Sequence, residues 1–251
     1  MPSLMPALAG RRALVTGAAR GLGAAFAVVL ADLGAEVVAT ARRRERLEPL
    51  AGAIAARCGR RPETLALDLA DDASLAQAAE AVAAGGLDLL VNNGAFWLPG
   101  RLAELAPEEI RQAVDSAVTG TLLVTRALLP ALLAAPAGDI VTVVSMSGLP
   151  NVPLFGASPA FYAAKHGQAG LADGLRQELR GTPVRSIAIH PPMIEDVSPL
   201  EPAWDGLPAR GKERGITNRD VVEAALFALG RPRSCTVASL VLDADSGGIF
   251  G

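Results

Sequence analysis

The stretch RALVTGAARGLGAAFAVVLADLG (residues 12–34) decides the fold class of this chain. Its first part, RALVTG (12–17), is a short and continuously apolar run, which is typical of a buried β-strand. Its last part, GLGAAFAVVLADLG (21–34), is apolar on nearly all sides and ends at a glycine, which predicts a buried helix. A buried strand that leads through a glycine-rich turn into a buried helix indicates an α/β protein.

The same alternation of strand and helix continues along the rest of the chain. Because the expected strands are continuously apolar, they belong in a parallel sheet that is covered on both faces. We therefore predict an α/β Rossmann-like fold: a doubly wound three-layer sandwich with a parallel sheet of about seven strands, in one domain over residues 1–251. The other expected strands are 36–41, 63–69, 87–93, 139–145, 184–190 and 236–243. The other expected helices are 44–59, interrupted or kinked near Pro49, and 71–86, 107–135, about 160–180 and 218–230.

Composition and charge exclude several classes of function. The chain has 251 residues, a net charge of −3 and no basic block, so a nucleic-acid partner is not expected. Its start, MPSLMPALAGRR, lacks the features of a signal peptide, and charged residues interrupt the most apolar run, residues 24–41. We therefore expect a cytoplasmic protein without a membrane span. No metal site is predicted.

One long irregular segment, residues 191–217, follows the sixth expected strand and contains five prolines. Loops that follow the carboxyl ends of parallel strands form the ligand crevice of such a sheet. The segment is therefore either a lid over a substrate or an excursion on the surface, and we favour the lid.

The turn TGAARGLG (16–23) has the glycine spacing of a phosphate-binding turn. Gly17 permits a tight turn, and Gly21 and Gly23 allow the backbone around Leu22 to approach a ligand closely. The amino end of the following helix favours an anion such as a pyrophosphate. These residues predict a dinucleotide cofactor at the carboxyl ends of the strands.

The pattern TGxxxGxG resembles that of the short-chain dehydrogenase/reductase family, and other family motifs follow in order over roughly residues 10–250. The matching motifs are Asp68 in LDL, the turn NNGA (92–95), Ser145 at a strand end, Lys165 on a helix and the turn HPP (190–192). The resemblance implies an oxidoreductase that uses a nicotinamide cofactor. It also implies that this cofactor contacts Gly17, Arg20, Gly21, Leu22, Gly23, Asp68, Leu69, Asn93, Gly94, Lys165, Pro191 and Ile194.

Three arginines favour NADP(H) over NAD(H). An acid at the end of the second strand would bind the ribose 2′-hydroxyl of NAD, but Ala41 stands there and Arg42 and Arg43 follow. Arg20, inside the glycine turn, would lie close to the same ribose. Guanidinium groups bind a 2′-phosphate well, because they can donate two hydrogen bonds to it at once. The alternative is that these arginines only solvate the start of a helix.

The resemblance also implies a catalytic set, which this chain matches only in part. Family members use a tyrosine as acid and base, a lysine four residues later, a serine that binds the substrate oxygen and an asparagine that relays protons. Ser145 and Lys165 fit by position. The asparagine position, however, holds Ala117, and the tyrosine position holds Phe161, which cannot exchange a proton. Near Ala117, Ser116 and Thr119 are expected to point elsewhere.

Tyr162 is the residue that could replace the missing tyrosine. On a regular helix it points about 100° away from Phe161, although it can still approach Lys165 three residues later. Gly156 and Pro159 lie just upstream and could make the helix start irregular, which would shift the tyrosine hydroxyl into the site. We therefore predict Ser145, Tyr162 and Lys165 as the catalytic residues, with packing as the alternative role of Tyr162.

Three functions remain open from the sequence. The leading hypothesis is an NADPH-dependent reductase of ketones or aldehydes, which could also oxidise the corresponding alcohols. The second is a family member that binds NADP(H) with little or no turnover, and the third is the same fold repurposed for non-redox chemistry. By resemblance we expect a homodimer or homotetramer. Loop residues predict an apolar, ring-containing substrate: Phe96, Trp97, Leu200, Trp204 and Leu207.

Overall fold

A seven-stranded parallel sheet forms the centre of the protein. The structure is a computed structural model that describes residues 8–245; the ends of the expected domain, residues 1–7 and 246–251, lie outside this range. The strands run in the order β3-β2-β1-β4-β5-β6-β7, which confirms the predicted fold class. Their bounds are β1 Arg12–Val15, β2 Glu36–Ala41, β3 Glu63–Ala66, β4 Leu89–Asn92, β5 Asp139–Val143, β6 Arg185–His190 and β7 Ser239–Val241.

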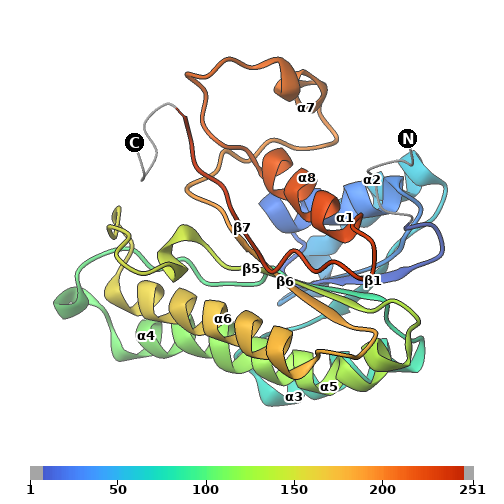
Figure 1. Ribbon diagram of the computed structural model, residues 1–251, viewed down its shortest axis with the longest axis horizontal. Coiled ribbons are helices and arrows are strands. Elements are labelled where there is room, and N and C mark those ends of the chain that lie inside the picture. The colour runs from blue at the N-terminus through green and yellow to red at the C-terminus, as the bar shows by residue number, and fades with distance from the viewer. Residues whose placement is uncertain (1–7, 246–251) are drawn as a thin grey trace.

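Helices cover both faces of the sheet (Figure 1). One face carries α1 Gly21–Asp32, α2 Glu48–Cys58 and α8 Asn218–Leu229, and the other carries α3 Asp72–Ala84, α4 Pro107–Val114, α5 Gly120–Ala134 and α6 Pro159–Glu178. The strand order reverses between β1 and β4, because β2 and β3 lie on one side of β1 and the later strands on the other. In a doubly wound sheet, ligands bind at the carboxyl ends of the strands beside this reversal.

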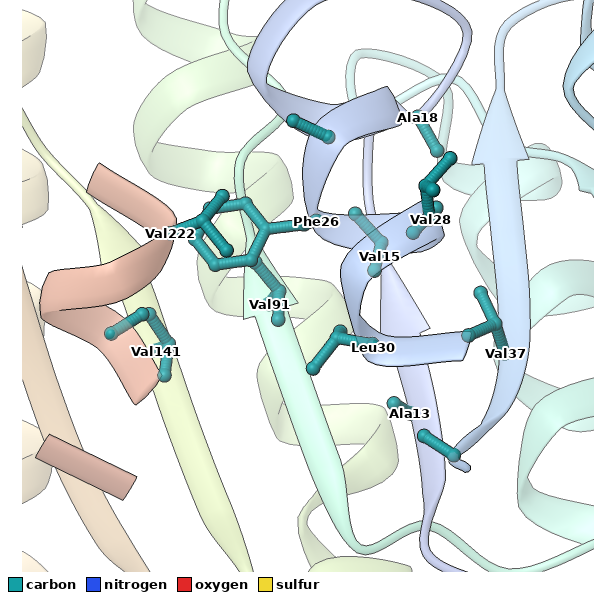
Figure 2. Close-up of a cluster of buried hydrophobic side chains, with 14 of the residues drawn as sticks. Ala13, Val15, Ala18, Phe26, Val28, Leu30, Val37, Val91, Val141 and Val222 are labelled. Carbon is teal, nitrogen blue, oxygen red and sulfur yellow. The ribbon is translucent and has the colours of Figure 1, made fainter. Parts of the chain in front are cut away.

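Helix α1 is buried because its side chains fill the space above the sheet. Phe26 and Leu30 face Val15 of β1 and Val91 of β4, and Val222 of α8 closes the cluster (Figure 2). Phe26 and Leu30 are each 1% exposed. Burial of a large apolar side chain contributes about 1.5–3 kcal/mol, so this cluster fixes α1 and its glycine turn against the strand ends.

Two of the expected helices are interrupted. The segment 44–59 begins as the short 3₁₀ turn Arg44–Leu47 and continues as α2, with Pro49 in its first turn, which confirms an interruption near Pro49. In the first turn of a helix a proline costs no backbone hydrogen bond. The helix expected over 107–135 is interrupted by a π-helical turn, Asp115–Thr119, between α4 and α5. By length and composition the segment Pro107–Ala134 could span a membrane, but here it packs on the sheet, with Leu128 and Leu132 fully buried.

The segment 191–217 leaves β6 and forms a loop that stands out beside α8 (Figure 1). It contains the short helix α7 Ala203–Gly206, and the backbone of Glu195 pairs with that of Ile216 to close its base. Trp204 is buried against the cluster of α1 and α8. Trp204 therefore anchors this loop to the body of the protein.

The amino end of the sheet carries a buried ionic cluster. Asp139, at the start of β5, is fully buried and accepts from Arg11 at 2.9 Å, Arg185 at 2.8 Å and Arg233 at 2.8 Å. All three guanidinium groups also donate to backbone carbonyls. Because every charge here has a partner, the cluster ties β5, β6 and the segments around them together.

Candidate active site

A cavity of about 1470 Å³ lies along the carboxyl ends of the strands. The segments that follow β1, β2, β3, β4, β5 and β6 all contribute to its lining. It brings together every residue that the sequence analysis assigned to the cofactor, and it includes Ser145 and Lys165. Tyr162 is not among its lining residues. The cavity is therefore the candidate active site.

The glycine turn leaves no room for side chains at one end of this cavity. A Cβ atom on Gly23 would come within 2.2 Å of the Gly17 carbonyl oxygen, and Gly17 and Gly21 have φ angles of 67° and 55°. Only glycine tolerates such contacts and angles without strain. The first amides of α1 are consequently free to bind an anion, which fits a cofactor diphosphate.

A second turn supports the first. The side chain of Asn93 donates to the Thr16 carbonyl at 3.0 Å, and the backbone amides of Asn93 and Gly94 donate to the Thr16 hydroxyl at 2.9 Å. A Cβ atom on Gly94 would meet the Leu69 side chain at 2.7 Å. The turns after β1 and β4 are thus locked together, which gives the ligand a rigid floor between them.

Four guanidinium groups line the cavity near the ends of β1 and β2. They belong to Arg20, Arg42, Arg43 and Arg46, and within residues 8–245 none of them makes an ion pair. Sequence reasoning missed Arg46, although its position three residues after Arg43 predicts the same side of a helical turn. Unpaired positive charge of this density fits a phosphate group better than a hydroxyl.

One carboxylate lies at the same end of the cavity. Asp196, just after β6, is exposed and reaches the glycine turn, so that a Cβ atom on Gly21 would meet its Oδ2 atom at 2.7 Å. The sequence analysis did not single it out. Its negative charge opposes the binding of a diphosphate at this turn.

Ser145 lies at the end of β5 with its hydroxyl in the cavity. Its Oγ atom accepts a hydrogen bond from the Ser147 amide at 3.1 Å, and its carbonyl oxygen lies 3.0 Å from the His190 Nδ1 atom. Since the Oγ atom accepts rather than donates here, the hydroxyl proton remains available to a substrate oxygen. Burial lowers the pKa of His190, which therefore favours its neutral form.

Lys165 projects from α6 toward the same place. It is 5% exposed, and its Nζ atom donates to the Gln168 Oε1 atom at 2.7 Å and lies 3.4 Å from the Val143 carbonyl oxygen. Burial without a nearby carboxylate lowers the pKa of Lys165 to about 7. Its charge therefore changes in the physiological range.

Phe161 fills the position beside Lys165 where the family tyrosine was expected. Its ring lies 5.6 Å from the Lys165 Nζ atom and packs edge-to-face against Trp97, with 4.7 Å between the ring centres. Phe161 is buried and lines the cavity. The cavity wall next to Lys165 is consequently a phenyl ring rather than a phenol.

The irregular helix start expected before Tyr162 is wrong. Ser158 caps α6 by accepting from the Phe161 amide, and the Tyr162 amide donates to the Ser158 carbonyl at 3.0 Å, as in a regular helix. The Tyr162 hydroxyl donates to the Leu149 carbonyl, and its ring lies against His166. The acid–base role predicted for Tyr162 requires a hydroxyl in the cavity, and the regular helix turns it away.

The π-helical turn Asp115–Thr119 corrects another expectation. Ala117 is buried and offers no polar atom, as predicted. Ser116, however, lines the cavity together with Gln112, because the extra residue of a π turn rotates the helix surface. The Ser116 hydroxyl donates to the Gln112 carbonyl at 2.6 Å. The sequence contains no signal that would have revealed this turn.

Apolar side chains dominate the outer part of the cavity. Phe96 and Trp97 line it, as the sequence analysis expected, while Leu200, Trp204 and Leu207 do not. Trp204 instead packs beneath Arg219 in the body of the protein. Residues that the sequence analysis did not name complete the wall: Met146, Val152, Leu154, Phe155 and Met193.

Comparison with known proteins identifies the family. Residues 11–203 match the sequence model of the short chain dehydrogenases. The chain belongs to this family. An uncharacterised oxidoreductase of Staphylococcus saprophyticus is 30% identical over 235 residues, which cover 93% of this chain and 97% of that relative.

Solved structures of other family members agree closely with this fold. A metagenomic short-chain oxidoreductase in complex with NADP is 31% identical, with a TM-score of 0.77 over 94% of this chain and 98% of that one. A short-chain dehydrogenase of Salmonella enterica serovar Typhi is 27% identical, with a TM-score of 0.80 over 97% and 99% of the two chains. The resemblance inferred from the motifs is thereby confirmed.

Proposed function

We propose that this short-chain dehydrogenase is an NADP(H)-dependent oxidoreductase that reduces a ketone or aldehyde, or oxidises the corresponding alcohol. The observation that carries the proposal is the course of the cavity. It runs from four unpaired guanidinium groups, past a glycine turn, to Ser145 and Lys165. The NADP bound to a similar solved protein supports the same cofactor.

The chain's own residues would bind and orient the reactants. The amides at the start of α1 would bind the diphosphate, and Arg20, Arg42, Arg43 and Arg46 would bind the 2′-phosphate. The Ser145 hydroxyl would donate to the carbonyl oxygen of the substrate. When bound, NADPH supplies the hydride, and the protein supplies position and a proton.

A second function is favoured by one specific observation. Phe161 stands in the cavity where a proton donor was expected, and Tyr162 is turned away from it. A protein that binds NADP(H) with little turnover would have this arrangement. Loss of one acid–base group lowers a rate by about 10² to 10⁴, so slow turnover and absent turnover must be separated by measurement.

The cofactor is tested first. Fluorescence titration should give tighter binding of NADPH than of NADH, and the double substitution Arg42→Ala/Arg43→Ala should remove most of this preference. Each hydrogen bond to a charged group contributes about 1.5–3 kcal/mol, which corresponds to a loss of NADPH affinity of ten-fold or more. Arg44→Ala is the matched control, because Arg44 does not line the cavity. Equal binding of the two cofactors by the wild type would contradict NADP(H) specificity.

Turnover is tested next, with NADPH oxidation against a panel of aromatic and aliphatic ketones and aldehydes. Reduction of at least one carbonyl class would support the oxidoreductase. Tight NADPH binding without reduction of any carbonyl, and without oxidation of the alcohols by NADP⁺, would favour the binding protein instead.

We further propose a cytoplasmic homodimer or homotetramer. The support is an exposed apolar strip on α5, where Leu122 is 46% and Leu133 is 39% exposed. Light scattering of the purified protein tests it, and a monomer at micromolar concentration would contradict it.

A further inference from the structure

Lysine is rare in this chain. Lys165 and Lys212 are its only lysines among 23 lysine and arginine residues. Lys212 is exposed and pairs with Asp245, as an arginine could. Lys165 is buried and lines the cavity next to Phe161. An arginine stays protonated at every accessible pH, so of these two basic side chains only a lysine could exchange a proton at this position.

Among its neighbours, Lys165 is the group that can exchange a proton in the cavity that Ser145 also lines. Phe161 has no ionisable group, and the Tyr162 hydroxyl is bonded to the Leu149 carbonyl outside the cavity. His190 on β6 is the titratable group that faces Lys165, but it is buried, and its Nδ1 atom faces the Ser145 carbonyl rather than the cavity. Its pKa is lowered partly by Lys165 itself.

Acidic groups do not compensate the charge of Lys165. Glu109 on α4 and Asp115 in the π turn belong to elements packed against α6, yet burial alone lowers the pKa of the lysine. Tyr162 and His166, on the same helix, are not among the causes of the lowered Lys165 pKa either. The ammonium group therefore loses its proton easily, which a proton donor requires.

Gln168 is the residue that fixes the ammonium group. It is fully buried one helical turn after Lys165, and its Oε1 atom accepts from the Nζ atom at 2.7 Å. Its Nε2 atom has no hydrogen-bond partner among the described residues. A buried unsatisfied amide costs about 1–3 kcal/mol, so an apolar residue would suit the core better. This cost is explained if the Oε1 atom is needed to aim the lysine.

We propose that Lys165 itself donates and accepts the proton of the reaction, in place of the absent tyrosine, and that Gln168 positions it. This inference rests on the proposed function. In the reductive direction the carbonyl carbon gains a hydride from NADPH, which is oxidised to NADP⁺. The carbonyl π bond breaks, and the substrate oxygen forms an O–H bond with a proton from the Lys165 ammonium group. Neutral Lys165 then regains a proton from water, and the oxidation of an alcohol reverses these steps.

A pH profile follows from this role. Reduction needs the ammonium form, so kcat/KM for a ketone should fall as the pH rises above about 7, the pKa that burial gives Lys165. Oxidation of the alcohol needs the neutral amine and should rise over the same range. A tyrosine with an ordinary pKa of about 10 would give neither change.

The first experiment measures the lysine directly, without cofactor or turnover. Protein labelled with ¹³C at the lysine Cε atoms gives two side-chain signals, and Lys212→Arg assigns them by removing one. We expect the Lys165 signal to titrate near pH 7, well below the range of an unperturbed lysine. Titration of the Lys165 signal above pH 9 would overturn the proposal.

The second experiment tests Gln168 as a positioning residue. In Gln168→Glu a carboxylate faces the ammonium group and should move the midpoint of the reduction profile upward by about 1 to 3 pH units. In Gln168→Leu the midpoint should move downward, because the charged form loses its acceptor. A merely structural role would lower activity in both variants without moving either midpoint, and this result would overturn the role of Gln168.

The third experiment separates this inference from the proposed function. Lys165→Arg keeps the charge and should lower kcat about 10² to 10⁴-fold, while adding Phe161→Tyr to that variant should restore part of the loss. An active wild type whose Lys165→Arg variant stays within ten-fold of it would overturn the proton role alone. A wild type that reduces no carbonyl would overturn the proposed function and the proton role together, whatever the lysine titration shows.

Discussion

Two buried basic side chains lie at opposite ends of the same sheet, and they differ in whether a carboxylate pairs with them. Arg185, at the amino end, and Lys165, at the carboxyl end, are each 5% exposed. Arg185 bonds to the Asp139 carboxylate and to three backbone carbonyls. Lys165 has no carboxylate partner within residues 8–245; its ammonium group donates to the Gln168 amide oxygen at 2.7 Å and, more weakly, to the Val143 carbonyl at 3.4 Å.

The difference shows how burial serves stability at one end and chemistry at the other. A buried charge with all its partners fixes the chain segments around it. A buried charge without a counter-ion has a perturbed pKa, and perturbed values gather at functional sites. The cavity arginines extend the contrast, because Arg42 and Arg43 also lack ion-pair partners within residues 8–245. At the cavity, these positive charges lie where a phosphate group of a ligand could pair with them.

The largest expected effect comes from breaking the paired end. Asp139→Ala leaves Arg11, Arg185 and Arg233 without their shared carboxylate and should lower the free energy of unfolding by about 3–5 kcal/mol. Urea denaturation at fixed protein concentration measures it. Asp173→Ala is the control, because the Asp173–Arg176 pair lies on the surface and should contribute less than about 1 kcal/mol. Equal losses of unfolding free energy in the two variants would contradict the stabilising role of the buried Asp139.

The buried lysine, in contrast, should lower the stability of the protein at neutral pH and do so less as the pH rises. The pKa of Lys165 is about 7 in the folded protein and 10.5 for an unperturbed lysine, so the unfolded chain binds the proton more tightly. Stability of the wild type should therefore rise with pH, by about 3 kcal/mol between pH 7 and 9.5 relative to Lys165→Met. Urea denaturation across this range measures it. Lys212→Met, at an exposed site, should show no such trend, and a flat difference for Lys165→Met would refute the lowered pKa.

The smallest expected effect concerns the one acid at the glycine turn. Asp196→Asn removes a negative charge beside Gly21 and should tighten NADPH binding several-fold, which is less than about 1 kcal/mol because the carboxylate is exposed. Fluorescence titration at low ionic strength measures it. Asp205→Asn changes the same charge on α7, away from the cavity, and should leave the affinity unchanged. Weaker binding by Asp196→Asn would mean that the carboxylate assists the cofactor.

The residues that local sequence patterns assigned to the cofactor lie together in the structure. The glycine turn, Arg42, Arg43, Asn93 and Gly94 all line one cavity. Each belongs to a short segment directly after an apolar strand, and parallel strands bring their carboxyl ends to one edge. Position along the chain therefore determines position in space for these residues.

The surroundings of Lys165 could not be predicted in the same way. Tyr162 and Phe161 are neighbours, and only the N-cap formed by Ser158 shows that α6 is regular and that the phenylalanine faces the cavity. Ser116 reaches the cavity because of a π turn that no residue pattern announces. Each outcome depends on helix phase, and one residue changes the direction of a side chain by about 100°.

By itself the sequence determined the family, the order of strands and helices, and the residues of the glycine turn, because these follow from apolar periodicity and from steric requirements of the backbone. Only the tertiary structure decided that Phe161 and not Tyr162 lines the cavity. It also decided that Lys165 is buried and donates to Gln168 rather than to a carboxylate. The physical reason is that a pKa depends on burial and on neighbours from other segments, α6, β5 and β6, which local sequence does not specify.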